Sequence, residues 1–309
     1  MGSTGSRLLS GNSSLVEELE DKIAAFKFKE SALFFNSGYQ LNNGIIPHIV
    51  GESDVVFGDK YIHASMVEGT IRSKAKLIRF KHQSLTHLES LLKKNRLSYK
   101  KALIMIESLY SMDGDKAPLE ELIQLSKDYN CELYVDEAHA IGVYGENGEG
   151  LISKKLAKDI SYHVGTFGKA FGSSGAFIAC SESFKESLIN SCKAFIYSTA
   201  LPLPVISWNL STINLMPTLS ERRETLISLC DYAASLFSCN WESYICPYIV
   251  GDSEKTIELS LALKEKGIWT LPIRPPTVQA SASRLRLSLT YWHTKSDLDA
   301  LYQAIKSCR

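Results

Sequence analysis

The chain has 309 residues, of which 45% are hydrophobic and 22% are charged, and its formal net charge at pH 7 is +0. These values are typical of a globular protein that is long enough for two domains with a sizeable core. A balanced charge offers no polyanion-binding surface, so we expect no nucleic-acid partner, and no apolar run reaches the ~18 residues that a membrane span requires.

The seven cysteines lie mostly within apolar segments and form no Cys-x-x-Cys pair: Cys131, Cys180, Cys192, Cys230, Cys239, Cys246 and Cys308. We interpret them as reduced, buried small hydrophobes of a cytoplasmic protein. We expect no signal peptide before the first predicted helix. The histidines outside the candidate site described below lack the spacing of metal ligands, so we expect no metal centre.

A helix is predicted over residues 14–26. Ser14 and Glu17 have the spacing of a capping box, and apolar residues recur at helical spacing behind them. Five short apolar segments then read as buried strands: Val55–Phe57, Lys76–Phe80, Leu103–Ile106, Leu133–Val135 and Ala176–Ala179. Helical patterns lie between them, such as the one that begins at Pro118. This alternation predicts an α/β fold with a mostly parallel, doubly wound sheet.

After Pro204 the pattern changes. A long helical stretch to about Phe237 leads to a smaller α+β region with strands over 244–250, 269–273 and 285–289 and a closing helix from about Ser296. We therefore predict a large α/β domain over residues 1–204. Residues 205–309 form the linking helix and a small C-terminal domain.

The most informative segment is a turn of small residues, 165–172, that presents Lys169. Upstream, the predicted strand 133–135 runs into Asp136 and, three residues later, His139. Ligands of open α/β sheets bind beyond the carboxyl ends of the strands, where these two side chains would lie. A lysine on such a turn and an acid at a strand end suit pyridoxal phosphate (PLP), because the lysine can form a Schiff base and the acid can keep the ring nitrogen protonated. Each feature alone is common, since most lysines are solvated and strand-terminal acids often cap turns.

Six stretches together carry a resemblance to a known family: Ser37–Tyr39, Asp59–Ser65, Ser111–Asp115, Asp136–His139, Thr166–Lys169 and Ser198–Pro202. They occur in the order seen in the α-oxoamine synthases, which are PLP enzymes of fold type I. The chain resembles this family from Gly2 to nearly its C-terminus, and most of all the branch that makes 8-amino-7-oxononanoate in biotin biosynthesis. The resemblance implies a PLP-dependent acyltransferase with the fold type I architecture, including its large PLP-binding domain.

The resemblance also implies roles for individual residues. Lys169 would carry PLP and move the substrate proton, and Asp136 would bind the ring nitrogen. His63 would stack on the face of the ring, while His139 and Ser111 would lie near its phenolic oxygen. A loop or capping role is the alternative for His63, and without the family Ser111 is part of a simple polar turn.

The phosphate of PLP would be held at a helix start. Gly38 and Tyr39 stand between an apolar segment and a predicted helix, where backbone N–H groups are available to an anion. The resemblance adds Thr166 from the lysine's own turn, and Ser198 and Thr199 from a partner subunit. It therefore implies a homodimer with shared active sites.

Residues 284–289 alternate with period two, which places Arg284 and Arg286 on one face of a strand and three leucines on the other. A solvated face would explain this pattern equally well. In the family the second arginine binds the amino acid carboxylate, a role that suits a bidentate guanidinium. We therefore predict Arg286 as the substrate-binding residue.

The reaction implied is a decarboxylative condensation of L-alanine with a pimeloyl thioester of CoA or acyl carrier protein, which gives 8-amino-7-oxononanoate, CO2 and the free carrier. Two alternatives stay open. The first is another α-oxoamine synthase such as glycine C-acetyltransferase, although residues 198–202 resemble the biotin-pathway form more closely. The second is a non-catalytic, truncated homologue that acts as a partner subunit. The family carries a segment before the glycine-rich turn at which this chain starts, and we expect a chain without it to be less stable and less active.

Overall fold

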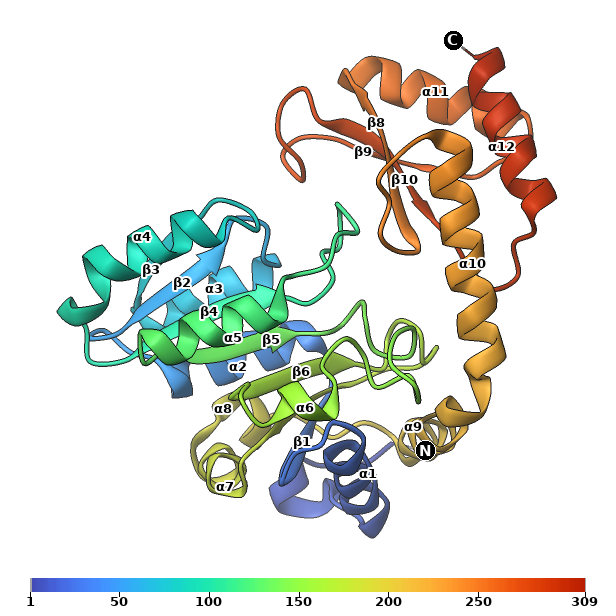
Figure 1. Ribbon diagram of the computed structural model, residues 1–309. Helices are drawn as coiled ribbons and strands as arrows, with labels where there is room; N and C mark the ends of the chain where they lie inside the picture. Colours follow the sequence, from blue (N-terminus) through green and yellow to red (C-terminus); the bar gives the residue numbers. More distant parts are fainter. Residues whose placement is uncertain (1, 309) are drawn as a thin grey trace. The chain divides into compact units, whose positions relative to one another are not determined.

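The computed structural model describes residues 2–308, which form two compact units (Figure 1). The first unit comprises the described residues up to Leu109 together with Ala117–Leu219. The second comprises Tyr110–Lys116 together with the described residues from Ser220 onward. The domain boundary predicted between residues 204 and 205 stays a prediction.

A seven-stranded sheet with the order β1-β7-β6-β5-β4-β2-β3 forms the centre of the first unit. Its strands are β1 (Ser31–Phe35), β2 (Val55–Asp59), β3 (Lys76–Phe80), β4 (Ala102–Glu107), β5 (Glu132–Asp136), β6 (Tyr162–Thr166) and β7 (Ala176–Cys180). Adjacent strands from β3 to β6 are parallel, and β7 is antiparallel to both of its neighbours. The predicted mostly parallel sheet is therefore confirmed, and β1 and β6 complete it.

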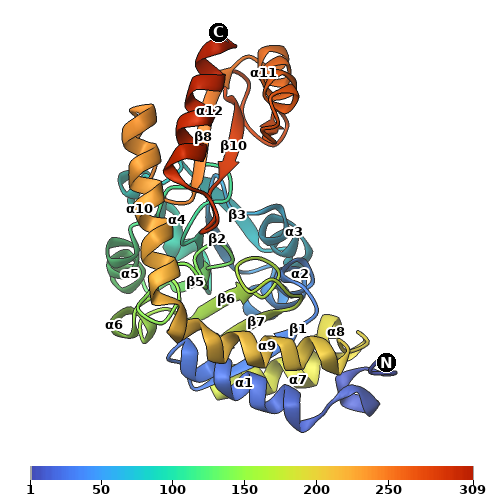
Figure 2. The same cartoon turned by 90° about the vertical axis from the view of Figure 1, so that its right-hand side faces the viewer.

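Helices cover both faces of this sheet, as a doubly wound fold requires. The helices of the unit are η1 (Arg7–Gly11), α1 (Ser14–Phe26), α2 (Gly38–Ile49), α3 (Ala64–Ser73), α4 (Leu85–Asn95), η2 (Arg96–Ser98), α5 (Leu119–Asp128), α6 (Lys154–Ala157), α7 (Glu182–Ser191), α8 (Lys193–Ile196), α9 (Leu203–Leu215) and η3 (Met216–Leu219). One apolar cluster joins α2, α3, α7 and α8 to one face. Clusters on the other face join α4, α5 and α6 and, beside β1 and β7, the neighbouring helices α1 and α9 (Figure 2).

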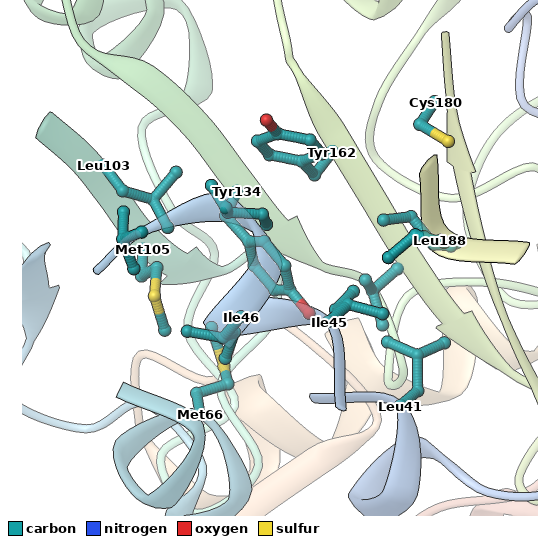
Figure 3. Close-up of a cluster of buried hydrophobic side chains, with 14 of the residues drawn as sticks. Leu41, Ile45, Ile46, Met66, Leu103, Met105, Tyr134, Tyr162, Cys180 and Leu188 are labelled. Carbon is teal, nitrogen blue, oxygen red and sulfur yellow. The ribbon is translucent and has the colours of Figure 1, made fainter. Parts of the chain in front are cut away.

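Tyr134 of β5 lies in the core between the sheet and α2 (Figure 3). Its ring is buried with Ile45 and Ile46 of α2 and Met105 of β4. Burying an apolar side chain of this size contributes about 1.5–3 kcal/mol. Its hydroxyl group donates a hydrogen bond to Asn42 of the same helix, so the packing of this ring also fixes a polar side chain close to the end of β5.

The second unit is a three-stranded antiparallel sheet with the order β8-β10-β9, packed with three helices around one apolar core. Its elements are α10 (Ser220–Phe237), β8 (Ile245–Gly251), α11 (Ser253–Glu265), β9 (Leu271–Ile273), β10 (Ser283–Ser288) and α12 (Lys295–Ser307). The predicted strands are present with shifted ends. Strand β9 is shorter than predicted, because residues 269 and 270 lie outside the ladder with β10.

Two helix predictions are wrong in detail. The stretch after Pro204 is not one helix, since α9 ends at Leu215, a 3-10 turn follows over Met216–Leu219, and α10 then begins. Pro217 lies in that turn and has no backbone N–H to continue an α-helix. The predicted start at Pro118 is one residue early, because Pro118 is the N-cap of α5.

The capping box predicted at the start of α1 is also wrong. Ser13, not Ser14, is the N-cap, and its side chain makes no capping hydrogen bond. Glu17 instead accepts a hydrogen bond from Asn12 Nδ2 at 2.8 Å. Asn12 precedes the helix and binds the Glu17 carboxylate, which in a capping box would accept a hydrogen bond from the backbone of the N-cap residue.

Stability should fall in mild acid because of His163 on β6. Burial, and then the charges of Lys27 and Lys29, lower the pKa of this fully buried side chain well below its usual 6.5. The unfolded chain therefore takes up this proton first, and the free energy of unfolding decreases as the pH falls below about 6.5. We expect His163→Leu to reduce this dependence in urea unfolding curves recorded between about pH 7.5 and 5.5. An unchanged slope against pH would mean that other groups cause the acid sensitivity.

Candidate active site

A pocket of about 200 Å³ lies in the first unit at the carboxyl ends of β4, β5 and β6. The residues that line it are Gly38, Tyr39, Asn42, His63, Ser65, Glu107, Asp136, Ala138, His139, Val164, Gly165, Thr166 and Lys169. The three strands are parallel, so their last residues meet at one edge of the sheet, where ligands of such sheets bind.

Seven of the predicted site residues line this pocket: Gly38, Tyr39, His63, Asp136, His139, Thr166 and Lys169. Ser198 and Thr199 are not among the lining residues. Ser198 Oγ accepts a hydrogen bond from Gln40 in the first turn of α2, and the Thr199 carbonyl accepts one from Asn36 Nδ2 at 2.8 Å. Their predicted role toward a partner subunit stays a prediction.

Lys169 lies exposed on the turn between β6 and β7. Two backbone bonds of 2.9 Å close the base of this turn, from Phe167 N to Gly175 O and from Ser173 N to Phe167 O. Gly175 has φ +107, and a Cβ atom there would come within 2.2 Å of the Phe34 ring. The turn therefore needs glycine at this position and holds the lysine at the edge of the pocket.

Asp136 ends β5 and is buried at 7% exposure. Its Oδ1 accepts a hydrogen bond from the Ala138 backbone at 2.9 Å, and its Oδ2 accepts one from Asn42 Nδ2 at 3.1 Å. Each carboxylate oxygen is thus held by one donor, and the orientation of the group is fixed before any ligand arrives.

Glu137 follows directly but serves a different part of the unit. It is fully buried, and its Oε2 is paired with Lys27 Nζ, which also donates to the Glu149 carbonyl. Its Oε1 accepts from the backbone of Leu151 at 2.8 Å and of Ile152 at 3.1 Å. This carboxylate ties α1 and the loop around Gly150 to the segment that carries Asp136.

His63 is the N-cap of α3, and its Nδ1 atom accepts a hydrogen bond from the Ser65 backbone at 3.2 Å. The same atom lies 2.7 Å from Ser65 Oγ. At the start of α2, Ser37 Oγ accepts from Gln40 N at 3.2 Å, and Gly38 and Tyr39 of the first turn line the pocket. Two helix starts and three strand ends therefore build the site.

The groups at this pocket fit PLP. They include a primary amine at Lys169, a carboxylate at Asp136, the imidazole of His63 and a helix N-terminus at Gly38, which match the aldehyde, ring nitrogen, ring face and phosphate. A Cβ atom added to Gly38 would have no neighbour within 4 Å, so the start of α2 opens onto free space. The described residues therefore offer groups complementary to these four parts of the cofactor.

In the second unit, the two arginines of β10 bond to the turn at residues 111–113. Arg284 is buried, and its Nη1 donates to Asp113 Oδ1 at 2.7 Å and to the Met112 carbonyl at 3.1 Å. Arg286 is half-buried, and its Nε donates to the Ser111 carbonyl at 2.7 Å. Burial lowers the pKa of the Arg286 guanidinium from its usual value. Ser111 and Arg286 thus belong to one unit and are held together.

Six residues that line the pocket were not predicted as site residues, and three of them carry polar side chains: Asn42, Ser65 and Glu107. Glu107 had a readable signal, since it ends the apolar strand β4 as Asp136 ends β5, and the two residues are partners in the parallel ladder. Asn42 had none, because it lies inside α2, and only the fold shows which face of that helix meets the site. Ser65 lies in the stretch Asp59–Ser65 that carries the family resemblance, but no sequence feature assigned its side chain a role.

Within residues 2–308, no group of three or more His, Cys, Asp or Glu side chains is arranged to hold a metal ion. A search of the same residues finds no helix with the length and apolar character needed to cross a membrane.

The aminotransferase class I and II family matches residues 1–305 of the chain. A protein of Haemophilus influenzae named "Putative 8-amino-7-oxononanoate synthase" is 42% identical over 295 residues, which cover 93% of this chain and 78% of the relative. A protein with the same name from Halalkalibacterium halodurans is 41% identical over 306 residues, covering 97% and 77%.

Solved structures of similar fold include enzymes of the same kinds. A serine palmitoyltransferase from S. paucimobilis with bound PLP and myriocin superposes with a TM-score of 0.93 at 29% identity, over 99% of this chain and 79% of the other. An 8-amino-7-oxononanoate synthase from Francisella tularensis gives 0.84 at 29% identity, over 96% and 87%. The predicted resemblance, fold and cofactor are confirmed, and the chain belongs to the aminotransferase class I and II family as a PLP-dependent transferase of the α-oxoamine synthase group.

Proposed function

We propose that this protein condenses L-alanine with a pimeloyl thioester to give 8-amino-7-oxononanoate. A C–C bond forms between the alanine α carbon and the thioester carbonyl carbon, the carrier leaves as its free thiol, and the alanine carboxylate leaves as CO2. The observation that carries the proposal is the pocket that gathers Lys169, Asp136, His63 and His139 from three separate segments of the chain. The names of the relatives support this choice of substrates.

Two residues of the pocket, Lys169 and Asp136, would take a direct part in the proposed reaction. PLP, when bound, supplies an electron-withdrawing ring that stabilises negative charge on the α carbon of alanine. Lys169 would hold the cofactor and move the α-proton, a function that typically contributes ~10²–10⁴ in rate. Asp136 would hold the proton of the ring nitrogen, because its carboxylate is already oriented by Ala138 and Asn42.

The remaining predicted residues would position the cofactor. His63 would lie against the ring, and His139 and Ser111 would donate to its phenolic oxygen. Gly38, Tyr39, Thr166, Ser198 and Thr199 would bind the phosphate, the last two across the interface of a homodimer. The seven cysteines, none of them in a disulfide, favour a reducing compartment such as the cytoplasm.

Arg286 would bind the alanine carboxylate. We expect Arg286→Ala to raise the KM for alanine about tenfold or more, the value of one charge-assisted hydrogen bond, and to leave the KM for the thioester nearly unchanged. Arg284→Ala should instead lower the melting temperature, because it leaves Asp113 without its buried partner. Steady-state kinetics and thermal melting on both variants test this assignment. A selective effect of Arg284→Ala on the KM for alanine would reverse it.

Product analysis tests the proposed function directly. The purified protein with PLP is incubated with L-alanine and either pimeloyl-CoA or pimeloyl acyl carrier protein, and 8-amino-7-oxononanoate is detected by mass spectrometry. Parallel reactions contain glycine with acetyl-CoA and L-serine with palmitoyl-CoA. Turnover only in one of these would assign a different α-oxoamine synthase reaction. Visible absorbance of bound PLP without any turnover would favour the non-catalytic partner subunit.

A further inference from the structure

A chain of buried hydrogen bonds connects Tyr134, Asn42, Ser65 and His63, with Asp136 attached at Asn42. Asn42 is 2% exposed and Ser65 is fully buried. Asn42 Nδ2 lies 3.1 Å from Asp136 Oδ2 and 3.0 Å from Ser65 Oγ, while its Oδ1 faces the Tyr134 hydroxyl. The last hydrogen bond of this series joins Ser65 Oγ to His63 Nδ1 at 2.7 Å.

The direction of the first bonds follows from the chemistry of Asp136. A carboxylate only accepts hydrogen bonds, so the Asn42 atom that faces it must be the NH2 group and its oxygen must face Tyr134. Burial, and then the charge of Asp136, raise the pKa of Tyr134 well above its usual value. Tyr134 therefore keeps its proton, and its hydroxyl group donates a hydrogen bond to Asn42 Oδ1.

The direction of the last bonds follows from the first. The second N–H of Asn42 points at Ser65 Oγ, so that oxygen accepts and its own proton is available for His63. The backbone N–H of Ser65 also points at His63 Nδ1, at 3.2 Å, and a backbone amide can only donate. Two donors thus converge on Nδ1, which has room for no proton of its own.

We propose that Asn42 and Ser65 are positioning residues that hold the His63 ring in the neutral tautomer protonated on Nε2. His63 then acts in the pocket as a hydrogen-bond donor, because a proton on Nδ1 would displace both Ser65 donors. The side-chain amide of Asn42 in this hydrogen-bond relay, formed by Tyr134, Asn42, Ser65 and His63, also fixes the orientation of Asp136. One polar network therefore sets the orientation of His63, the N-cap of α3, and of Asp136, the last residue of β5. The tautomer itself follows from the hydrogen bonds, and only the use of the His63 Nε2 proton in catalysis rests on the proposed function.

The tautomer can be determined by ¹⁵N NMR of the 309-residue protein with PLP, labelled with ¹⁵N-histidine. His63→Gln identifies the His63 signals among the seven histidines. In the wild type we expect Nδ1 to resonate as an unprotonated ring nitrogen and Nε2 as a protonated one. A protonated Nδ1 would overturn the proposal, whether or not the protein has any turnover.

Two variants test the relay itself. Ser65→Ala removes the hydroxyl donor and leaves only the backbone N–H of residue 65 on His63 Nδ1, and Asn42→Ala removes the group that orients the hydroxyl. We therefore expect each variant to increase the share of His63 that is protonated on Nδ1. Asn43→Ala is the matched control, because Asn43 is the adjacent asparagine of α2 and its Nδ2 bonds to the Tyr39 carbonyl at 3.1 Å. An unchanged tautomer in both relay variants, or the same change in the control, would show that Asn42 and Ser65 do not set it.

Discussion

Lys169→Ala is expected to abolish formation of 8-amino-7-oxononanoate and to leave the fold intact. The variant removes the amine that would both hold PLP and move the α-proton. The side chain is exposed on the turn between β6 and β7, so its loss uncovers no buried apolar surface. Turnover should therefore fall by more than the ~10²–10⁴ that a proton-transfer group contributes alone, with an unchanged far-UV circular dichroism spectrum.

Lys158→Ala is the matched control, since Lys158 is an exposed lysine of the same unit. It should keep full activity. Borohydride reduction followed by peptide mapping should place the pyridoxyl group on Lys169 in the wild-type protein. A label on any other lysine, or substantial turnover by Lys169→Ala, would refute the assignment.

Lys27→Met is expected to cause the largest loss of stability. Lys27 and Glu137 are both fully buried, so the variant leaves an unpaired carboxylate in the interior, which typically costs about 3–5 kcal/mol. Urea unfolding measures this change. Lys93→Met, at the exposed ion pair with Glu89, should have little effect, because solvated pairs contribute little to stability.

The double variant Lys27→Met with Glu137→Gln separates charge from packing. The glutamine oxygen can still accept the backbone bonds of Leu151 and Ile152, and no buried charge remains. We expect it to recover much of the stability lost by Lys27→Met alone. If the double variant is as unstable as the single one, the loss comes from the shape of the lysine side chain and not from the unpaired carboxylate.

The fold could be predicted because its signals are local. Apolar strands alternate with helical patterns, and five of the seven strands of the large sheet follow from short apolar runs. Four of these five are buried as expected, whereas in β3 only Phe80 is buried. The break at Met216–Leu219 was harder to predict, because the flanking pattern is helical on both sides and only Pro217 marks it. The capping box predicted between Ser14 and Glu17 does not form because Asn12, which lies outside the helix, donates a hydrogen bond to the Glu17 carboxylate instead.

The site could be predicted where one residue carries its own signal. Lys169 stands on a turn of small residues and Asp136 ends an apolar strand, and both line the pocket. Asn42 could not be predicted, since its value lies in contacts with Tyr134, Ser65 and Asp136, which only the fold assembles. The buried ion pair of Glu137 could not be predicted either, because its partner Lys27 is distant in sequence. In the sequence alone, Lys27 resembles a surface lysine at the end of a helix.

The antiparallel strand β7 bears on the order in which the site assembles. Because β7 returns directly beside β6, Thr166 pairs with Ala176, and the hairpin that presents Lys169 closes on contacts local in sequence. Asp136 meets Asn42 across 94 positions of the chain, and loops of that length close slowly. In pulse-labelling hydrogen exchange during refolding, we expect the β6–β7 amides to gain protection before those that join β1 to β7. Folding would then bring the carboxylate and its amide partner to a lysine that is already in place.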